Sequence, residues 1–121
     1  VFKGKFDYLV ELDNEQAIAA LKPDFRKLSR IPSRGVLVTA KGEQVDFVSR
    51  CFFPQSGIDE DPVTGSAHCL LTTYWHGRTG RNTFDAIQLS ERKGKLECEL
   101  KGDRVLMSGN AKTYLKGEIY I

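Results

Sequence analysis

Short apolar runs, each closed by proline, glycine or polar residues, predict three strands in the first half of the chain. Residues 2–12 end in an apolar run, residues 35–40 are apolar and β-branched, and residues 45–53 run up to Pro54. Runs of this length and composition are typical of buried strands. We therefore expect the first half of the chain to supply the buried part of a sheet.

Two short helices are predicted between the first two strands. Asp13 or Asn14 offers an N-cap, and an apolar stripe follows until Pro23 closes the helix. A second helical turn fits residues 24–28, because proline favours the start of a helix. Both helices are short, so we expect them on the outside of the fold.

Residues 66–78 predict the longest helix. A helix that is apolar nearly all round is usually central rather than on a surface. We therefore expect this helix at the centre of the fold, with Cys69 buried and inert and with Tyr74 and Trp75 filling core. The apolar positions fall on more than one face: Ala67, Cys69, Leu70, Leu71, Tyr74 and Trp75.

The last third of the chain alternates apolar and polar residues, and Gly-containing turns divide it into four predicted strands. We therefore expect the α+β class, with a largely antiparallel sheet wrapped around one apolar helix. The four strands are residues 84–89, 96–100, 105–107 and 114–121.

Composition adds limits. The 121 residues are 40% apolar and 28% charged, which fits one globular domain. The net charge of +2 is too small to argue for nucleic acid or an anionic membrane as a partner. Three cysteines without CxxC spacing favour reduced thiols in a cytoplasmic protein over disulfides or a zinc site. Residue 1 is Val and the single Met is Met107, so we expect the chain to be one part of a longer protein.

Candidate chemistry gathers in the loop before the longest helix. Asp59, Glu60 and Asp61 crowd into a Pro- and Gly-containing loop that leads to Thr64, Gly65, Ser66 and Ala67. The free N–H groups of a helix's first turn form an anion site. A carboxylate such as Asp61 beside that site is placed to move a proton while the N–H groups hold a substrate anion.

The same loop also has a structural interpretation. Thr64 or Ser66 is an N-cap, and the acidic residues favour a helix start. Spacing alone favours the structural interpretation.

Residues 60–68 read Glu-Asp-Pro-Val-Thr-Gly-Ser-Ala-His, and Leu70, Tyr74 and Trp75 follow. This run resembles the signature of the phenazine-biosynthesis PhzF-like family, which shares the diaminopimelate epimerase fold. The resemblance covers nearly the whole chain. It extends to residues 7–11, 34–39, 50–54, 88–90 and 104–109.

The resemblance implies a fold of two similar halves, each a mixed, largely antiparallel β-barrel-like sheet around a central helix, with the active site between them. This chain resembles the C-terminal half, as one domain over residues 1–121, and the N-terminal domain is absent from it. Asp61 matches one of two acid–base groups, and the other, a Glu, belongs to the first half. Thr64, Gly65, Ser66 and Ala67 match the positions that bind the substrate carboxylate. Neither a cofactor nor a metal is expected, because proton transfer needs neither.

Three further residues are candidates for accessory roles: Glu60, His68 and Arg50. His68 lies in the first helical turn, where the dipole disfavours its charged form, and it either assists the site or is structural. Arg50 either pairs with a loop carboxylate or faces an acidic substrate. We expect no metal at the remaining His and Cys positions of the helix, since residues 68, 69 and 76 do not share one face.

Two functions follow from the sequence. The first is a PhzF-like isomerase that moves a proton on a small carboxylate-bearing substrate and is inactive without its first half. The second is a noncatalytic domain that binds a small anion or a partner chain, of which a homodimer is one form.

Overall fold

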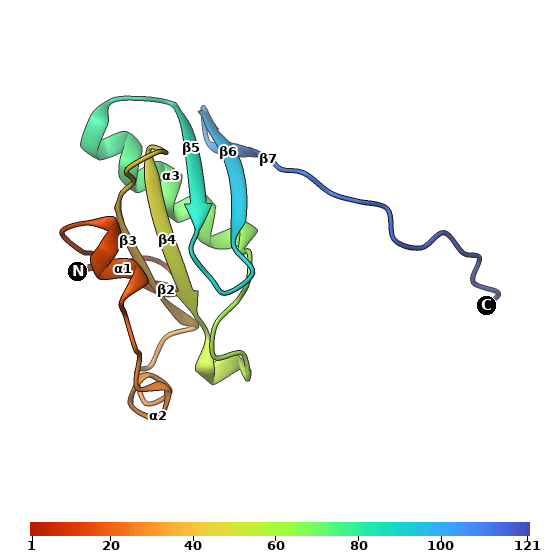
Figure 1. Cartoon of the computed structure of the whole chain (residues 1–121), viewed down its shortest axis with the longest axis horizontal. Coiled ribbons are helices and arrows are strands. Elements are labelled where there is room, and N and C mark those ends of the chain that lie inside the picture. The colour runs from red at the N-terminus through yellow and green to blue at the C-terminus, as the bar shows by residue number, and fades with distance from the viewer.

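One sheet of seven strands carries the fold, and its strands lie side by side in chain order (Figure 1). The computed structural model describes all residues from 1 to 121. The strands are β1 (Phe2–Lys3), β2 (Asp7–Glu11), β3 (Gly35–Lys41), β4 (Phe47–Phe52), β5 (Thr83–Gln88), β6 (Gly94–Lys101) and β7 (Arg104–Ser108). The helices are α1 (Glu15–Ala19), α2 (Phe25–Leu28), the 3₁₀ helix η1 (Pro54–Ser56) and α3 (Gly65–Thr79).

The sheet is mixed because helices occupy two of its connections. β2 and β3 are parallel and are joined through α1 and α2, while β4 and β5 are parallel and are joined through η1 and α3. A parallel pair needs such a crossover, whereas the other pairs are antiparallel and are joined by turns. The α+β prediction is confirmed. β1 and β7 are the two free edges of the sheet, so no closed barrel is seen.

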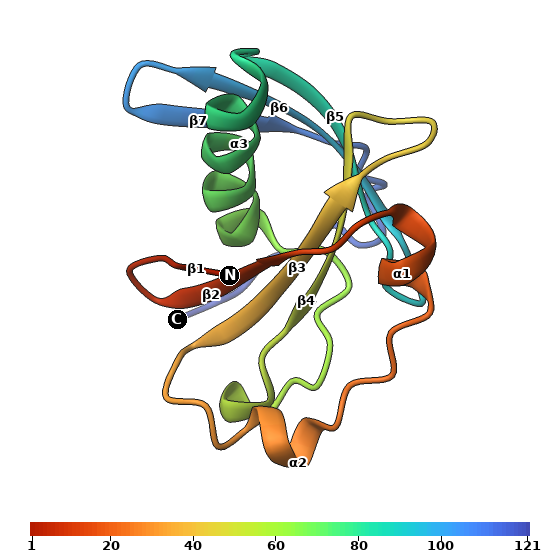
Figure 2. The ribbon, with the colours of Figure 1, turned by 90° about the vertical axis from the view of Figure 1, so that its left-hand side faces the viewer.

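The sheet curves past α3 and buries one core against it (Figure 2). Phe47 lies at the centre of this core, with its ring 5.9 Å from the rings of both Trp75 and Phe84. The opposite face of the sheet packs a second core under α1, where Ile18 meets Val36 and Val38. β3 is buried on both faces, which explains its uninterrupted apolar sequence.

Two predicted strands differ from the observed ones. Residues 2–12 form two strands, β1 and β2, with a turn between them in which the Gly4 N–H donates to the Asp7 carbonyl. Residues 114–121 form no strand. The chain leaves the sheet after β7 and extends away from it (Figure 1), so these residues meet no neighbouring strand to hydrogen-bond. Their apolar side chains, from Tyr114 to Ile121, are exposed.

The longest helix lies against the sheet as predicted, but only one side of it is covered. α3 buries Ala67, His68, Leu71, Thr72 and Trp75. The prediction that Cys69 is buried is wrong: its side chain is exposed, because the sheet reaches around only part of the helix. None of the helices could span a membrane.

Candidate active site

The loop between η1 and α3 is held against three strands. The Asp61 N–H donates to the Cys51 carbonyl at the end of β4 over 3.0 Å. The Ser90 hydroxyl, just after β5, donates to the Pro62 carbonyl over 2.7 Å. Val63 packs on Gly94 at the start of β6, where a Cβ atom would lie only 2.1 Å from a Val63 methyl carbon. These contacts fix the loop before it enters α3.

Thr64 is the N-cap residue of α3, but its hydroxyl does not cap the helix. The hydroxyl instead donates to the Asp61 carboxylate, with 2.5 Å between Oγ1 and Oδ2. No acidic residue lies in the first turn of α3. The N–H groups of Gly65, Ser66 and Ala67 meet no acceptor in the chain. Thr64 therefore occupies the N-cap position that the structural interpretation gives it, but neither its side chain nor an acidic residue caps the first turn.

The arrangement places a helix start with free N–H groups next to a carboxylate. Three unpaired N–H groups at the positive end of a 15-residue helix favour a bound anion such as a carboxylate. Gly65 and Ser66 are exposed, so a ligand can reach their backbone, while the Thr64 and Ala67 side chains are buried. Asp61 is half-buried beside this site and is held by Thr64. The loop can therefore hold a small anion next to a proton-accepting group.

Gln88, at the end of β5, is a site residue that sequence reasoning missed. It is fully buried, and its Oε1 accepts from the Thr64 N–H over 2.8 Å. Its Nε2 donates to the Asp61 carbonyl over 2.6 Å and to the Thr64 hydroxyl over 3.2 Å. One signal in the sequence could have found it. The alternation of β5 assigns position 88 to the core, and a buried amide needs hydrogen-bond partners.

Arg50 and Glu60 pair with each other. Arg50 Nε and Nη2 each lie 2.7 Å from one Glu60 carboxylate oxygen. Arg50 Nη1 donates to the carbonyls of Ile18 and Leu21, which ties the loop to α1. The hydrogen bonds to Glu60 raise the pKa of Arg50. Of the two sequence alternatives for Arg50, the structure supports pairing with a loop carboxylate. A second arginine, Arg34, pairs with Asp7 on β2.

His68 is buried under the site. Its Nδ1 lies 2.8 Å from the Thr64 carbonyl, and because a carbonyl only accepts, Nδ1 carries the proton. Burial lowers the pKa of His68, so the ring is neutral at neutral pH with Nε2 unprotonated. Its ring stacks on Phe47. The histidine therefore supports the loop from below and does not reach the open side of the helix.

The lowered pKa of His68 predicts a pH-dependent stability. The unfolded chain binds a proton on His68 near the ordinary value of 6.5, whereas the folded chain does so only at lower pH. Stability therefore falls as pH drops from about 7 to 5, by at most about 1.4 kcal/mol per pH unit. Urea unfolding across this range should show the fall, and His68→Gln should flatten it. The matched variant His76→Gln, at the other histidine, should keep the slope of the wild type; a slope unchanged in His68→Gln would contradict the assignment.

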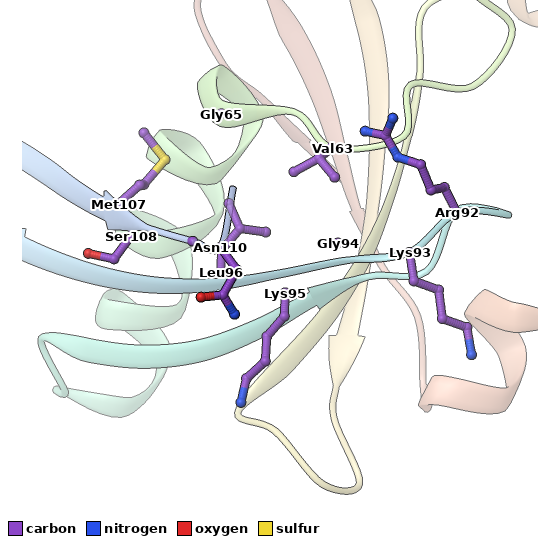
Figure 3. A pocket seen from close by; sticks show the side chains of 11 residues that line it. Val63, Gly65, Arg92, Lys93, Gly94, Lys95, Leu96, Met107, Ser108 and Asn110 are labelled. Atoms are coloured by element: carbon purple, nitrogen blue, oxygen red, sulfur yellow. The ribbon is translucent and has the colours of Figure 1, made fainter. Parts of the chain in front are cut away.

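An open cavity of about 660 Å³ lies between the start of α3 and the strands β6 and β7 (Figure 3). Val63, Gly65 and Met107 line it, and Asp61 does not. Arg92 extends along the side of the β5–β6 turn that faces the loop, whereas Lys93 and Lys95 point away from Val63 (Figure 3). The end of the loop and the helix start form one wall of this cavity.

The cysteines and histidines form no metal site in the structure. No group of three or more His, Cys, Asp or Glu side chains is close enough to hold a metal ion. Burial raises the pKa of Cys51 to about 12, which keeps it a thiol at neutral pH.

Comparison with known proteins identifies the family. Residues 1–117 match the family model described as phenazine biosynthesis-like protein. The chain belongs to the phenazine biosynthesis-like (PhzF) family. It is 51% identical to an uncharacterized isomerase of Pseudomonas aeruginosa over 95% of this chain and 44% of that protein. It is 47% identical to an uncharacterized isomerase of Halalkalibacterium halodurans over 100% of this chain and 46% of that protein.

Solved PhzF-family structures share the fold. A phenazine biosynthesis protein of the PhzF family from Enterococcus faecalis superposes with a TM-score of 0.86 at 47% identity, over 93% of this chain and 44% of that one. A PhzC/PhzF protein from Clostridium difficile gives a TM-score of 0.85 at 41% identity, over 95% of this chain and 45% of that one. The chain thus spans less than half the length of these PhzF relatives.

Proposed function

We propose that this chain is the C-terminal half of a PhzF-type isomerase, which transfers a proton on a small carboxylate-bearing substrate without cofactor or metal. One observation carries the proposal: the Asp61 carboxylate lies beside a helix start whose first three N–H groups are unpaired. Two relatives that bear the name isomerase, 51% and 47% identical to this chain, support it. Asp61 matches the acid of the family motif.

In this proposal each residue of the loop and helix start has its own role. The N–H groups of Gly65, Ser66 and Ala67, with the Ser66 hydroxyl, bind the substrate carboxylate and stabilise the charge that develops on it when the neighbouring carbon loses its proton. Thr64 holds Oδ2 of Asp61, and Oδ1, which accepts no hydrogen bond from the chain, exchanges the proton with substrate. Glu60, Arg50 and His68 fix the loop. A Glu from the first half supplies the second acid–base group.

Exposed apolar side chains support the proposal that the first half of the full-length protein packs against this chain. Phe2 and Phe6 near β1, and Leu106 and Met107 on β7, are each at least 39% exposed. These residues lie at the two free edges of the sheet, and Met107 also lines the cavity beside Gly65. Apolar surface of this kind marks an interaction face. A second copy of the chain is the alternative occupant, and a concentration-dependent dimer in analytical ultracentrifugation would favour it.

Deuterium uptake tests the proposal. The full-length protein and the 121-residue chain are each incubated in D₂O with a panel of small carboxylic acids that carry a C–H bond beside the carboxylate. We expect the full-length protein to exchange that hydrogen in at least one acid. The chain alone should exchange it at below ~1% of that rate, because one of two acid–base groups is missing. Rapid exchange by the chain alone would defeat the proposal of a divided site.

A further inference from the structure

We propose that Gln88 is a positioning residue of this site, and that the donor end of its amide sets the direction of the Thr64–Asp61 hydrogen bond. The inference rests on the proposed function for its catalytic readout, but its structural part stands on contacts alone. Gln88 lies on β5, outside the motif loop, and is fully buried.

The orientation of the Gln88 amide follows from two independent contacts. The Thr64 N–H only donates, so the Gln88 atom 2.8 Å from it is the oxygen, Oε1. The Asp61 carbonyl only accepts, so the Gln88 atom 2.6 Å from it is the nitrogen, Nε2. Both contacts demand the same orientation. The reversed amide would place like groups against each other at both positions.

This orientation determines the direction of the next hydrogen bond. Nε2 also lies 3.2 Å from the Thr64 hydroxyl oxygen, and because Nε2 only donates, that oxygen accepts. The hydroxyl proton of Thr64 is then directed to Asp61 Oδ2, which is 2.5 Å away. The chain of donors runs from Gln88 through Thr64 to Asp61. One carboxylate oxygen of Asp61 is thereby held, and the other is left for substrate.

The register of the sheet places the Gln88 side chain next to a small residue. Gln88 pairs in register with Ser49 on β4, which is also fully buried. Ser49 is small and its hydroxyl takes no partner, so it leaves room for the longer side chain. Gln88 contacts both ends of the four-residue segment 61–64, and its loss would free the carbonyl at one end and the amide at the other.

Two substitutions separate the donor from the acceptor role. Gln88→Met keeps the length of the side chain and removes all three hydrogen bonds. Gln88→Glu keeps an oxygen for the Thr64 N–H but removes the donor to the Asp61 carbonyl and the Thr64 hydroxyl. Ser90→Ala is the matched control for a loosened loop, because it removes a part-buried hydrogen bond to the Pro62 carbonyl of the same loop and leaves every hydrogen bond of Asp61 and Thr64 in place.

The catalytic readout is deuterium exchange by the full-length protein with the carboxylic acid that it turns over. We expect both Gln88 variants to lose about 100-fold in kcat with KM changed by less than about threefold, since misplacing one reacting group has an effect of this size. Ser90→Ala should stay within about threefold of wild type in both constants. Wild-type kcat in Gln88→Glu, or an equal loss in Ser90→Ala, would overturn the donor role.

The structural readout does not depend on activity. In NMR spectra, the Thr64 amide should exchange with solvent about tenfold faster in Gln88→Met than in wild type, because it loses its buried acceptor. The ¹³Cγ signal of Asp61 should shift in both Gln88 variants and not in Ser90→Ala. An unmoved Asp61 signal in both Gln88 variants would overturn the inference even where the wild type is active. Shifted signals in a full-length protein that exchanges no acid would uphold the contacts and reject the proposed function.

Discussion

Asp61→Asn should abolish proton exchange by the full-length protein, with a loss of ~10³-fold or more in kcat, and leave the fold intact. The asparagine amide cannot take up a proton at neutral pH, and loss of a positioned acid–base group has an effect of this order. The fold should survive because the side-chain oxygen of asparagine can still accept from the Thr64 hydroxyl. Deuterium uptake into substrate measures the loss, and circular dichroism measures the fold.

Asp59→Asn is the control for Asp61→Asn. Asp59 is an exposed carboxylate two residues earlier in the same loop, so its substitution changes the net charge equally. We expect its kcat to stay within about threefold of wild type, as for surface substitutions that contact nothing. Equal loss in the two variants would show that the charge of the loop matters and that Asp61 has no special role.

Arg50→Met should reduce the free energy of unfolding by about 2–4 kcal/mol, the largest stability effect we expect from a single residue of the site. The side chains of Arg50 and Glu60 are only 12% and 20% exposed. Removing Arg50 leaves a largely buried Glu60 carboxylate without a partner. It also removes the donor to the Ile18 and Leu21 carbonyls.

Two comparisons sharpen the Arg50 prediction. Arg81→Met breaks the ion pair with Asp46, where Arg81 is 57% exposed, and should cost no more than about 1 kcal/mol. The double variant Arg50→Met with Glu60→Met should lose less than the sum of its single changes, because it leaves no unpaired charge. Urea unfolding of the wild type and of the four variants, Glu60→Met alone included, measures these losses. A loss below 1 kcal/mol in Arg50→Met would show that the ion pair does not hold the loop.

Local pattern predicted most of the elements because each is bounded by its own residues. Apolar runs marked β3 and β4, and Asn14, one of the two predicted caps, caps α1 through the Ala17 N–H. Local pattern did not predict which elements lie next to each other in space. The alternation in residues 114–121 is that of a strand, yet a strand needs a partner, and the sheet ends at β7. Cys69 has apolar neighbours in sequence, yet it lies on the side of α3 that nothing covers.

In the candidate site, too, local sequence predicted the segment itself but not the distant residues that hold it. The loop, its helix start and Asp61 were predicted from one continuous segment and from its resemblance to a family motif. The groups that hold this segment come from distant parts of the chain: Gln88 is 24 residues from Thr64, and Arg50 reaches back 32 residues to the Ile18 carbonyl. Sequence spacing cannot pair residues across strands without the register of the sheet. The polar character of Gln88 was visible, but its partners were not.

Complementation tests the central claim most directly, namely that this chain carries one of two acid–base groups of a divided site. The 121-residue chain and a separately produced first half of the proposed full-length protein are mixed in D₂O with the carboxylic acid that the intact protein turns over. We predict no exchange by either part alone, exchange by the mixture, and none when the chain carries Asp61→Asn. Exchange by the chain alone, or equal exchange by the mixture with and without Asp61→Asn, would contradict the account.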